Sequence, residues 1–211
     1  IKFFCYPDKF TPHSFLRMLF GSVINKSAVF APVLSPDGAV SLRLILREGE
    51  KFSPISSRLA AIIADPDTVN AIYVAWEAIR GRIGTSINSL SIDLDDESFH
   101  GLSRSKLRLE GDSISLAAFI KFYMLFNNQF SNYQSIVATG AIRKKPLGYS
   151  IDRVEGVREK LEKTCLIKNP HQKTAIVVPK VNVKELDIAN SVNDIWTVNQ
   201  PLDFHCQHTA N

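Results

Sequence analysis

The sequence has 211 residues and a mass of 23.6 kDa, with 45% hydrophobic and 22% charged residues. These values exclude a disordered, collagen-like or disulfide-scaffold protein. They predict a single domain over residues 1–211, with residues 1–27 as a candidate terminal extension or linker. The net charge of +4 and the pI of about 9.0 are too weak a basic excess to indicate a nucleic-acid partner.

The cysteines and the apolar runs indicate a cytoplasmic protein. Cys5, Cys165 and Cys206 are odd in number and form no CxxC pair, which is typical of reduced thiols. No run of about 18 apolar residues occurs, so no membrane association is expected. His205-Cys206-Gln207-His208 is too short a cluster to favour a metal site, and we expect neither a metal nor a cofactor.

A β-hairpin is predicted over residues 28–47. β-Rich runs at 28–34 and 40–46 flank Ser35-Pro-Asp-Gly38, which is a strong turn signal. Pro32 favours an edge position for the first of these strands.

The next segment predicts helix and then strand. Residues 56–81 have helical spacing, with a start at Asp65-Pro66-Asp67 and an end at Gly81. Residues 89–94 alternate like a half-buried strand, and residues 95–105 are predicted to be a polar loop.

A long buried helix is predicted from Ser113 to about Asn128, because it is apolar nearly all round. Asp112 is its expected N-cap. We expect a strand over 134–140 and a basic loop over 143–153, which could contact acidic substrate or act as a lid.

The remaining elements are a helix from about Gly156, a buried strand over 174–179 and a short strand over 195–198. Helices and strands mix without a regular βαβ rhythm. This predicts an α+β fold with mixed sheets packed with helices.

Lysine chemistry is suggested by the helix that follows Gly156. Its apolar stripe contains Val157, Leu161, Thr164 and Cys165, and Arg158 and Lys160 lie at the two edges of that stripe. The pattern does not choose between the two, but only lysine can readily lose its proton in an apolar setting and act as a general base.

A nucleophile for such a base is available at Ser113. This serine lies at the predicted start of the buried helix, where backbone N–H groups lack intrahelical acceptors. The backbone N–H groups of Asp112 and Ser113 could therefore stabilise an oxyanion. The pattern also fits a capping serine and a solvent-reaching lysine.

The order of elements resembles the proteolytic domain of Lon-type proteases over the second half of the chain. The matching segments are Glu110-Gly-Asp-Ser113, the helix to Asn128, Ala138-Thr-Gly140, Gly156-Val-Arg-Glu-Lys160, Ala175-Ile-Val-Val-Pro179 and Lys184-Glu-Leu186. The resemblance implies a Ser-Lys dyad of Ser113 and Lys160, with Thr139 supporting the lysine. A more distant resemblance is to the polyprotein-processing proteases of birnaviruses, which share the dyad.

Departures from the Lon pattern define the alternative. Asp112 stands where the family has Pro, and Ile114 and Ser115 stand where it has small residues. Ser115 is a rival nucleophile, although its Oγ is expected to bond a backbone carbonyl. The competing hypothesis is therefore an inactive Lon-like domain used for binding or assembly.

The leading expectation is a serine endopeptidase that cleaves protein or peptide substrates through an acyl-enzyme. No P-loop pattern occurs, so no ATPase is expected in this chain. A homo-oligomer, or a separate ATPase or sensor domain, is the expected kind of partner.

Overall fold

The computed structural model describes residues 27–35, 38–48, 53–83, 88–105, 108–166, 173–186 and 194–207. The prediction of an extension over residues 1–27 falls almost entirely outside these ranges. So do Cys5, His208 and the side chain of Cys165.

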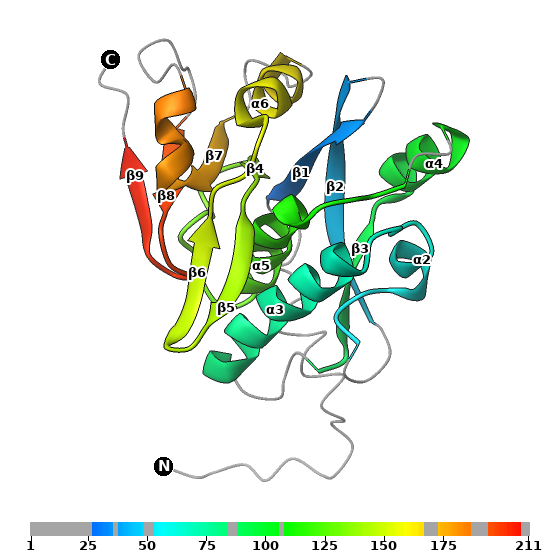
Figure 1. The fold of residues 1–211 in the computed structure, drawn as a ribbon, viewed down its shortest axis with the longest axis horizontal. Coiled ribbons are helices and arrows are strands. Elements are labelled where there is room, and N and C mark those ends of the chain that lie inside the picture. Colours follow the sequence, from blue (N-terminus) through cyan, green and yellow to red (C-terminus); the bar gives the residue numbers. More distant parts are fainter. Residues whose placement is uncertain are drawn as a thin grey trace, which may run out of the picture.

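A seven-stranded mixed sheet forms the centre of the molecule (Figure 1). Its order is β3-β2-β1-β4-β7-β8-β9, with parallel pairing from β1 through β4 and β7 to β8 and antiparallel pairing at both sides. The strands are β1 (Ala28–Ser35), β2 (Gly38–Glu48), β3 (Leu90–Leu94), β4 (Ser135–Ala138), β7 (Thr174–Pro179), β8 (Asp194–Val198) and β9 (Phe204–Gln207). The predicted mixed sheet packed with helices is confirmed, and β9 was missed.

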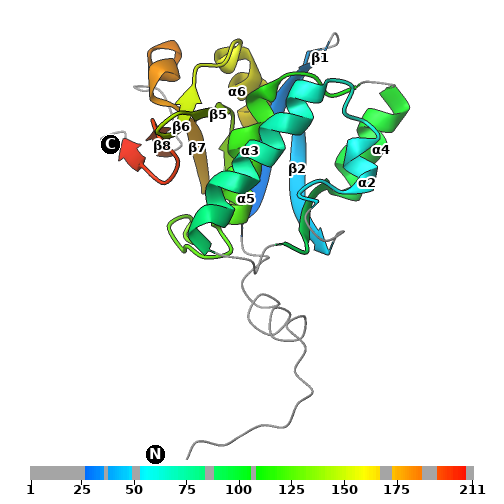
Figure 2. The same ribbon diagram turned by 60° about the horizontal axis from the view of Figure 1, so that its bottom comes forward.

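Two hydrophobic cores lie on the two faces of the sheet, because neighbouring side chains of a strand point to opposite faces. Val29 and Val177 belong to the larger core, whereas Phe30 and Val178 belong to the smaller one. The larger core contains α3 (Pro66–Ile83) and α5 (Ser115–Tyr123), which lie side by side (Figure 2). The smaller core contains α6 (Val157–Leu166).

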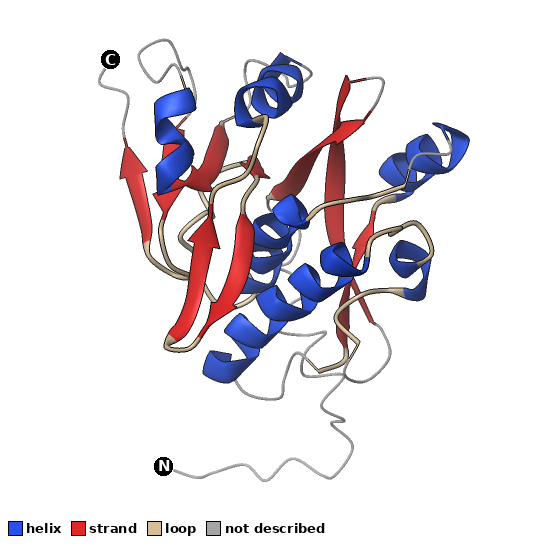
Figure 3. Cartoon of the chain, in the orientation of Figure 1, coloured by secondary structure: helices blue, strands red, loops and turns tan. Residues whose placement is uncertain are grey.

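The predicted basic loop over 143–153 is wrong: this region is a β-hairpin of β5 (Ala141–Lys145) and β6 (Gly148–Asp152). Gly148 has a φ of 134°, which lets the chain reverse tightly after Leu147. The buried pair Ile142 and Ile151 anchors the hairpin to the core, beside α3 (Figure 3). The charged residues conceal this short apolar alternation in the sequence.

The predicted helix over 56–81 is two helices, α2 (Ser57–Ala60) and α3. Gly81 does not end α3, which continues to Ile83. The predicted polar loop over 95–105 is also wrong. It is the helix α4 (Asp96–Ser105), whose first turn is capped by the Asp95 carboxylate accepting the Ser98 N–H at 2.9 Å.

The predicted long helix over 113–128 is shorter and begins differently. A 3-10 helix, η2 (Asp112–Ile114), leads into α5, which ends at Tyr123. Asp112 is not the N-cap, because it lies inside η2 and its carboxylate binds Arg143. The second 3-10 helix, η3 (Lys180–Glu185), follows β7.

Pro32 does not mark an edge strand, because β1 lies between β2 and β4. The pairing of β1 with β4 covers only Ala28 to Phe30, however, so Pro32 lies beyond the last β4 partner, Val137. From Ala31 onward β1 and β4 separate, and the missing N–H of Pro32 breaks no bond to β4.

Candidate active site

Helix α6 buries Lys160 and exposes Arg158. Of the two residues at the edges of its apolar stripe, Lys160 is therefore the candidate base. Lys160 is 6% exposed, whereas the side chain of Arg158 is 73% exposed and pairs with Glu162. Val157 lies three residues before Lys160 in the helix and Leu161 directly follows it. Both of these apolar residues pack in the smaller core. Burial lowers the pKa of Lys160, against the opposing influence of the Asp112 and Glu155 carboxylates. The helix therefore favours a lysine that can become neutral.

Ser113 is the second residue of η2, and the residue before η2 is a glycine with a positive φ. Gly111 has a φ of 84°, a conformation that favours glycine. Its N–H donates to the Asp65 carboxylate at 3.1 Å, and its carbonyl accepts from the Thr68 hydroxyl at 2.7 Å. The start of α3 thus fixes the loop that presents Ser113. The sequence did not reveal this role of Asp65 and Thr68.

The structure brings Ser113 and Lys160 together across 47 residues of sequence. Lys160 Nζ lies 3.4 Å from Ser113 Oγ, with Nζ as the donor. This is longer than the usual range for such a bond, and catalytic pairs are often loose before substrate binds. A small tightening would allow a neutral Lys160 to accept the hydroxyl proton.

The contact between Lys160 and Ser113 lies near the point where strands β1 and β4 separate. Both η2 and α6 contact β1, and the N–H of Gly140, two residues after β4, donates to the Ser113 carbonyl at 3.1 Å. Because β1 and β4 are no longer paired here, a side chain from one face of the sheet, Lys160, can reach a side chain from the other face, Ser113.

Thr139 follows β4 directly and is fully buried. Its backbone N–H donates to the Val177 carbonyl at 3.2 Å. Its Oγ1 is buried without a hydrogen-bond partner within the described part of the chain, so no bond to Lys160 is present. A buried hydroxyl without a partner is costly, which marks it as a group that a functional state could use.

The backbone N–H groups of Asp112 and Ser113 begin η2 and therefore have no acceptor within that helix. The Asp112 carboxylate lies beside them and pairs with the Arg143 guanidinium of β5 at 2.5 Å. A cavity of about 430 Å³ between α3 and β5 reaches Asp112 and opens next to this turn.

Ser115 is part of the scaffold. It is fully buried, and its Oγ lies 2.8 Å from the Asp112 carbonyl, as expected from the sequence. The same oxygen accepts the Ile142 N–H at 2.8 Å. These bonds link η2 to β5 and leave Ser113 as the better nucleophile.

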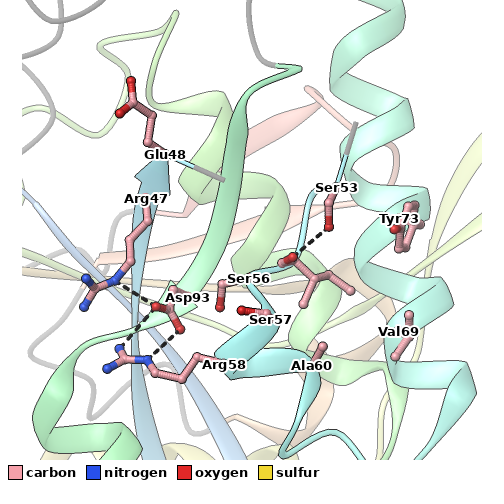
Figure 4. Close-up of a pocket in the computed structure, with 11 residues that line it drawn as sticks. Arg47, Glu48, Ser53, Ser56, Ser57, Arg58, Ala60, Val69, Tyr73 and Asp93 are labelled. Carbon is pink, nitrogen blue, oxygen red and sulfur yellow. Dashed lines mark hydrogen bonds and ion pairs between the residues drawn. The ribbon is translucent and has the colours of Figure 1, made fainter. Parts of the chain in front are cut away.

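A second cavity, of about 620 Å³, lies at the edge strand β3 (Figure 4). The Asp93 carboxylate at its wall is bound by Arg47 at 2.8 Å and by Arg58 at 3.2 Å. Arg58 also donates to the Leu94 carbonyl and pairs with Asp96 at 2.7 Å. Arg47, Arg58 and Asp93 of this cavity thus bind one another, which indicates a structural role in covering the edge of the sheet.

Other candidates stay apart from the dyad. Burial raises the pKa of the Cys206 thiol, which disfavours the reactive thiolate. Among the described residues no group of three metal-ligating side chains is found, and His205 binds Asp203 at 2.8 Å. In the same part of the chain, no helix combines the length and apolar character needed to cross a membrane.

Comparison with known proteins gives no family for this chain. No protein-family model matches it, and no curated protein matches its sequence.

Proposed function

We propose that this chain is a serine endopeptidase with a Ser113–Lys160 dyad on a Lon-like proteolytic domain. The observation that carries the proposal is the 3.4 Å contact between Lys160 Nζ and Ser113 Oγ, made by a lysine that is 6% exposed. Burial disfavours the ammonium form and lowers the pKa of Lys160, which favours its use as a general base.

Acylation begins when Ser113 Oγ attacks the substrate carbonyl carbon and its proton passes to the Lys160 amine. The N–H groups of Asp112 and Ser113 stabilise the oxyanion of the tetrahedral intermediate. When the C–N bond breaks, the Lys160 ammonium returns the proton to the leaving amine. Water then attacks the Ser113 ester with Lys160 again as the base, which releases the acid product and restores the serine. The Thr139 hydroxyl accepts a hydrogen bond from Lys160 while that residue carries the proton.

The proposal is tested with an unfolded, reduced and carboxymethylated protein as substrate. Wild type, Ser113→Ala, Lys160→Ala and Ser115→Ala are compared by mass spectrometry for peptide products and for a covalent acyl adduct. We expect cleavage and an adduct at Ser113 in wild type and in Ser115→Ala only. Wild-type rates in Ser113→Ala or Lys160→Ala would refute the dyad.

An inactive binding module is the second hypothesis, and Asp112 favours it because an unneutralised carboxylate opposes a nearby oxyanion. No adduct on any variant, with peptide binding retained in Ser113→Ala, would support it.

A further inference from the structure

The Asp112 carboxylate directly precedes Ser113, beside the N–H groups that would receive an oxyanion. A bare negative charge here opposes the charge that develops during acylation, and it also favours the ammonium form of Lys160. A dyad at this position therefore requires something that neutralises Asp112.

Arg143 meets this requirement from the neighbouring hairpin. Its Nη2 lies 2.5 Å from Asp112 Oδ2, and its Nε lies 3.4 Å from the Asp152 carboxylate of β6. Two carboxylates thus hold the guanidinium, and Lys145 pairs with Asp152 at 3.5 Å. The guanidinium fork is consequently held in one orientation.

The backbones on either side of the ion pair are also tied together. The Ser115 hydroxyl accepts the Ile142 N–H and lies within hydrogen-bond distance of the Asp112 carbonyl, both at 2.8 Å. One buried hydroxyl thus links the backbone of residue 112 to that of Ile142, the neighbour of Arg143. The ion pair spans this backbone link, with the Asp112 side chain 28% exposed and the Arg143 side chain 56% exposed.

We propose, building on the peptidase function above, that Arg143 is a positioning residue that neutralises Asp112 and directs its carboxylate toward β5, away from the acyl oxygen at Ser113. The pair replaces a neutral residue of the Lon pattern with two charges that cancel.

The charged groups around Lys160 are few enough for the effect of the Arg143–Asp112 pair on the pKa of Lys160 to be measured separately. Asp112 of η2 and Glu155, ahead of α6, are the two that act on its pKa. Strand β1, which packs on α6, has no charged side chain. The charged groups of the other packed elements, β2 and η3, are Arg43, Arg47, Glu48, Lys180, Lys184 and Glu185. On α6 itself, Arg158 pairs with Glu162 and both point to solvent.

The proposal predicts shifts of opposite sign. Arg143→Met leaves Asp112 unneutralised, which stabilises the Lys160 ammonium and moves the acid limb of acylation to higher pH. Asp112→Asn removes the negative charge and moves that limb to lower pH. Each shift should be about 0.5–1 pH unit, and the double variant should return close to wild type.

Two measurements are made on the 211-residue wild-type chain, the three variants and Lys144→Met. One is the rate of the p-nitrophenolate burst with p-nitrophenyl acetate as a function of pH. The other is the pKa of Lys160 by NMR of ¹³C-lysine protein, assigned with Lys160→Ala. Lys144→Met is the control for the pKa, because it removes a neighbouring cation that pairs with Glu77 and not with Asp112.

Shifts of the same sign in both single variants, or no shift in either, would overturn the proposal. If wild type shows no burst at any pH, the peptidase function fails, and the NMR pKa series still decides whether the ion pair acts on Lys160. If Arg143→Met does not fold, Arg143→Gln takes its place, and its pH shift should again be opposite in sign to that of Asp112→Asn.

Discussion

Gly140 donates its backbone N–H to the carbonyl oxygen of Ser113, at a position where Leu116 and Pro179 leave no room for a side chain. A Cβ at this position would lie 2.8 Å from Leu116 Cδ2 and 3.1 Å from Pro179 Cγ. The close approach allows the end of β4 to hold the turn that presents the candidate nucleophile.

Gly140→Ala is therefore expected to lower the free energy of unfolding by about 1–3 kcal/mol and to slow acylation, because the added methyl pushes β4 and η2 apart. Urea unfolding and the ester burst measure the two effects. Gly101→Ala is the matched control, since no atom lies within 4 Å of a Cβ there. That change lies inside α4 and should raise stability by about 0.5–1 kcal/mol.

Thr139→Val separates stability from activity. Because the Thr139 hydroxyl is buried and has no hydrogen-bond partner among the described residues, its replacement by a methyl group should leave the free energy of unfolding unchanged or raise it by about 1 kcal/mol. Acylation should fall about 10-fold, the equivalent of one lost hydrogen bond to Lys160. Unchanged acylation would remove Thr139 from the proposed mechanism.

Thr68→Val is the comparison for this change. Its hydroxyl donates to the Gly111 carbonyl at 2.7 Å, and the residue is equally buried. It should lose about 1–2 kcal/mol of stability in the same denaturant experiment.

The buried Lys121 should make the free energy of unfolding depend on pH in the alkaline range. This α5 residue is 7% exposed, and burial lowers its pKa from 10.5 to about 8. Below pH 8 the folded and unfolded chains both carry the ammonium, and its burial cost is complete. Between about pH 8 and 10.5 the unfolded chain binds more protons, so the free energy of unfolding rises with pH, by about 3 kcal/mol at most.

Lys121→Met should accordingly be more stable than wild type at pH 7, and the difference should disappear as the pH approaches 10.5. Urea unfolding at several pH values measures it, with the exposed Lys180→Met as control. A constant difference between Lys121→Met and wild type over this range would contradict the assignment.

Asp93→Asn tests the buried cluster at the edge of the sheet. The Asp93 side chain is 2% exposed, and removing its charge leaves the exposed Asp96 as the carboxylate that still pairs with both Arg47 and Arg58. The expected loss is about 3 kcal/mol in the free energy of unfolding. Glu77→Gln, in the exposed pair with Lys144, should change stability by less than about 1 kcal/mol.

Sequence reasoning located most of the strands and brought Ser113 and Lys160 forward together. It worked where periodicity was strong, as in β7, in which all six residues are buried. It failed where charge conceals packing, as in β5, which carries three exposed cationic residues beside two buried apolar ones. It also assigned α4 to a loop, because the segment is mostly polar and, among its described side chains, only Leu102 is buried.

The surroundings of the dyad could not be predicted because they depend on contacts between distant segments. Asp65 and Thr68 reach Gly111 across more than 40 residues, and Arg143 reaches Asp112 from a hairpin that was not foreseen. Local patterns carry no information on such contacts. The Lon resemblance supplied the pairing of Ser113 with Lys160, and the spacing of the two residues alone would not have done so.

The parallel pairing of Ala28 with Ser135 has a consequence for the order of events during folding. Strand β1 cannot pair with β4 until β4 is synthesised, more than 100 residues later. Parallel pairing between strands so far apart in the sequence forms slowly. Ser113 is held by Gly140, two residues after β4, and Lys160 is placed by a helix that packs on β1. The proposed dyad can therefore be completed only after the centre of the sheet has closed. Under the proposed function, a nascent or half-folded chain would not yet hydrolyse a peptide, because Ser113 and Lys160 would not yet be in contact.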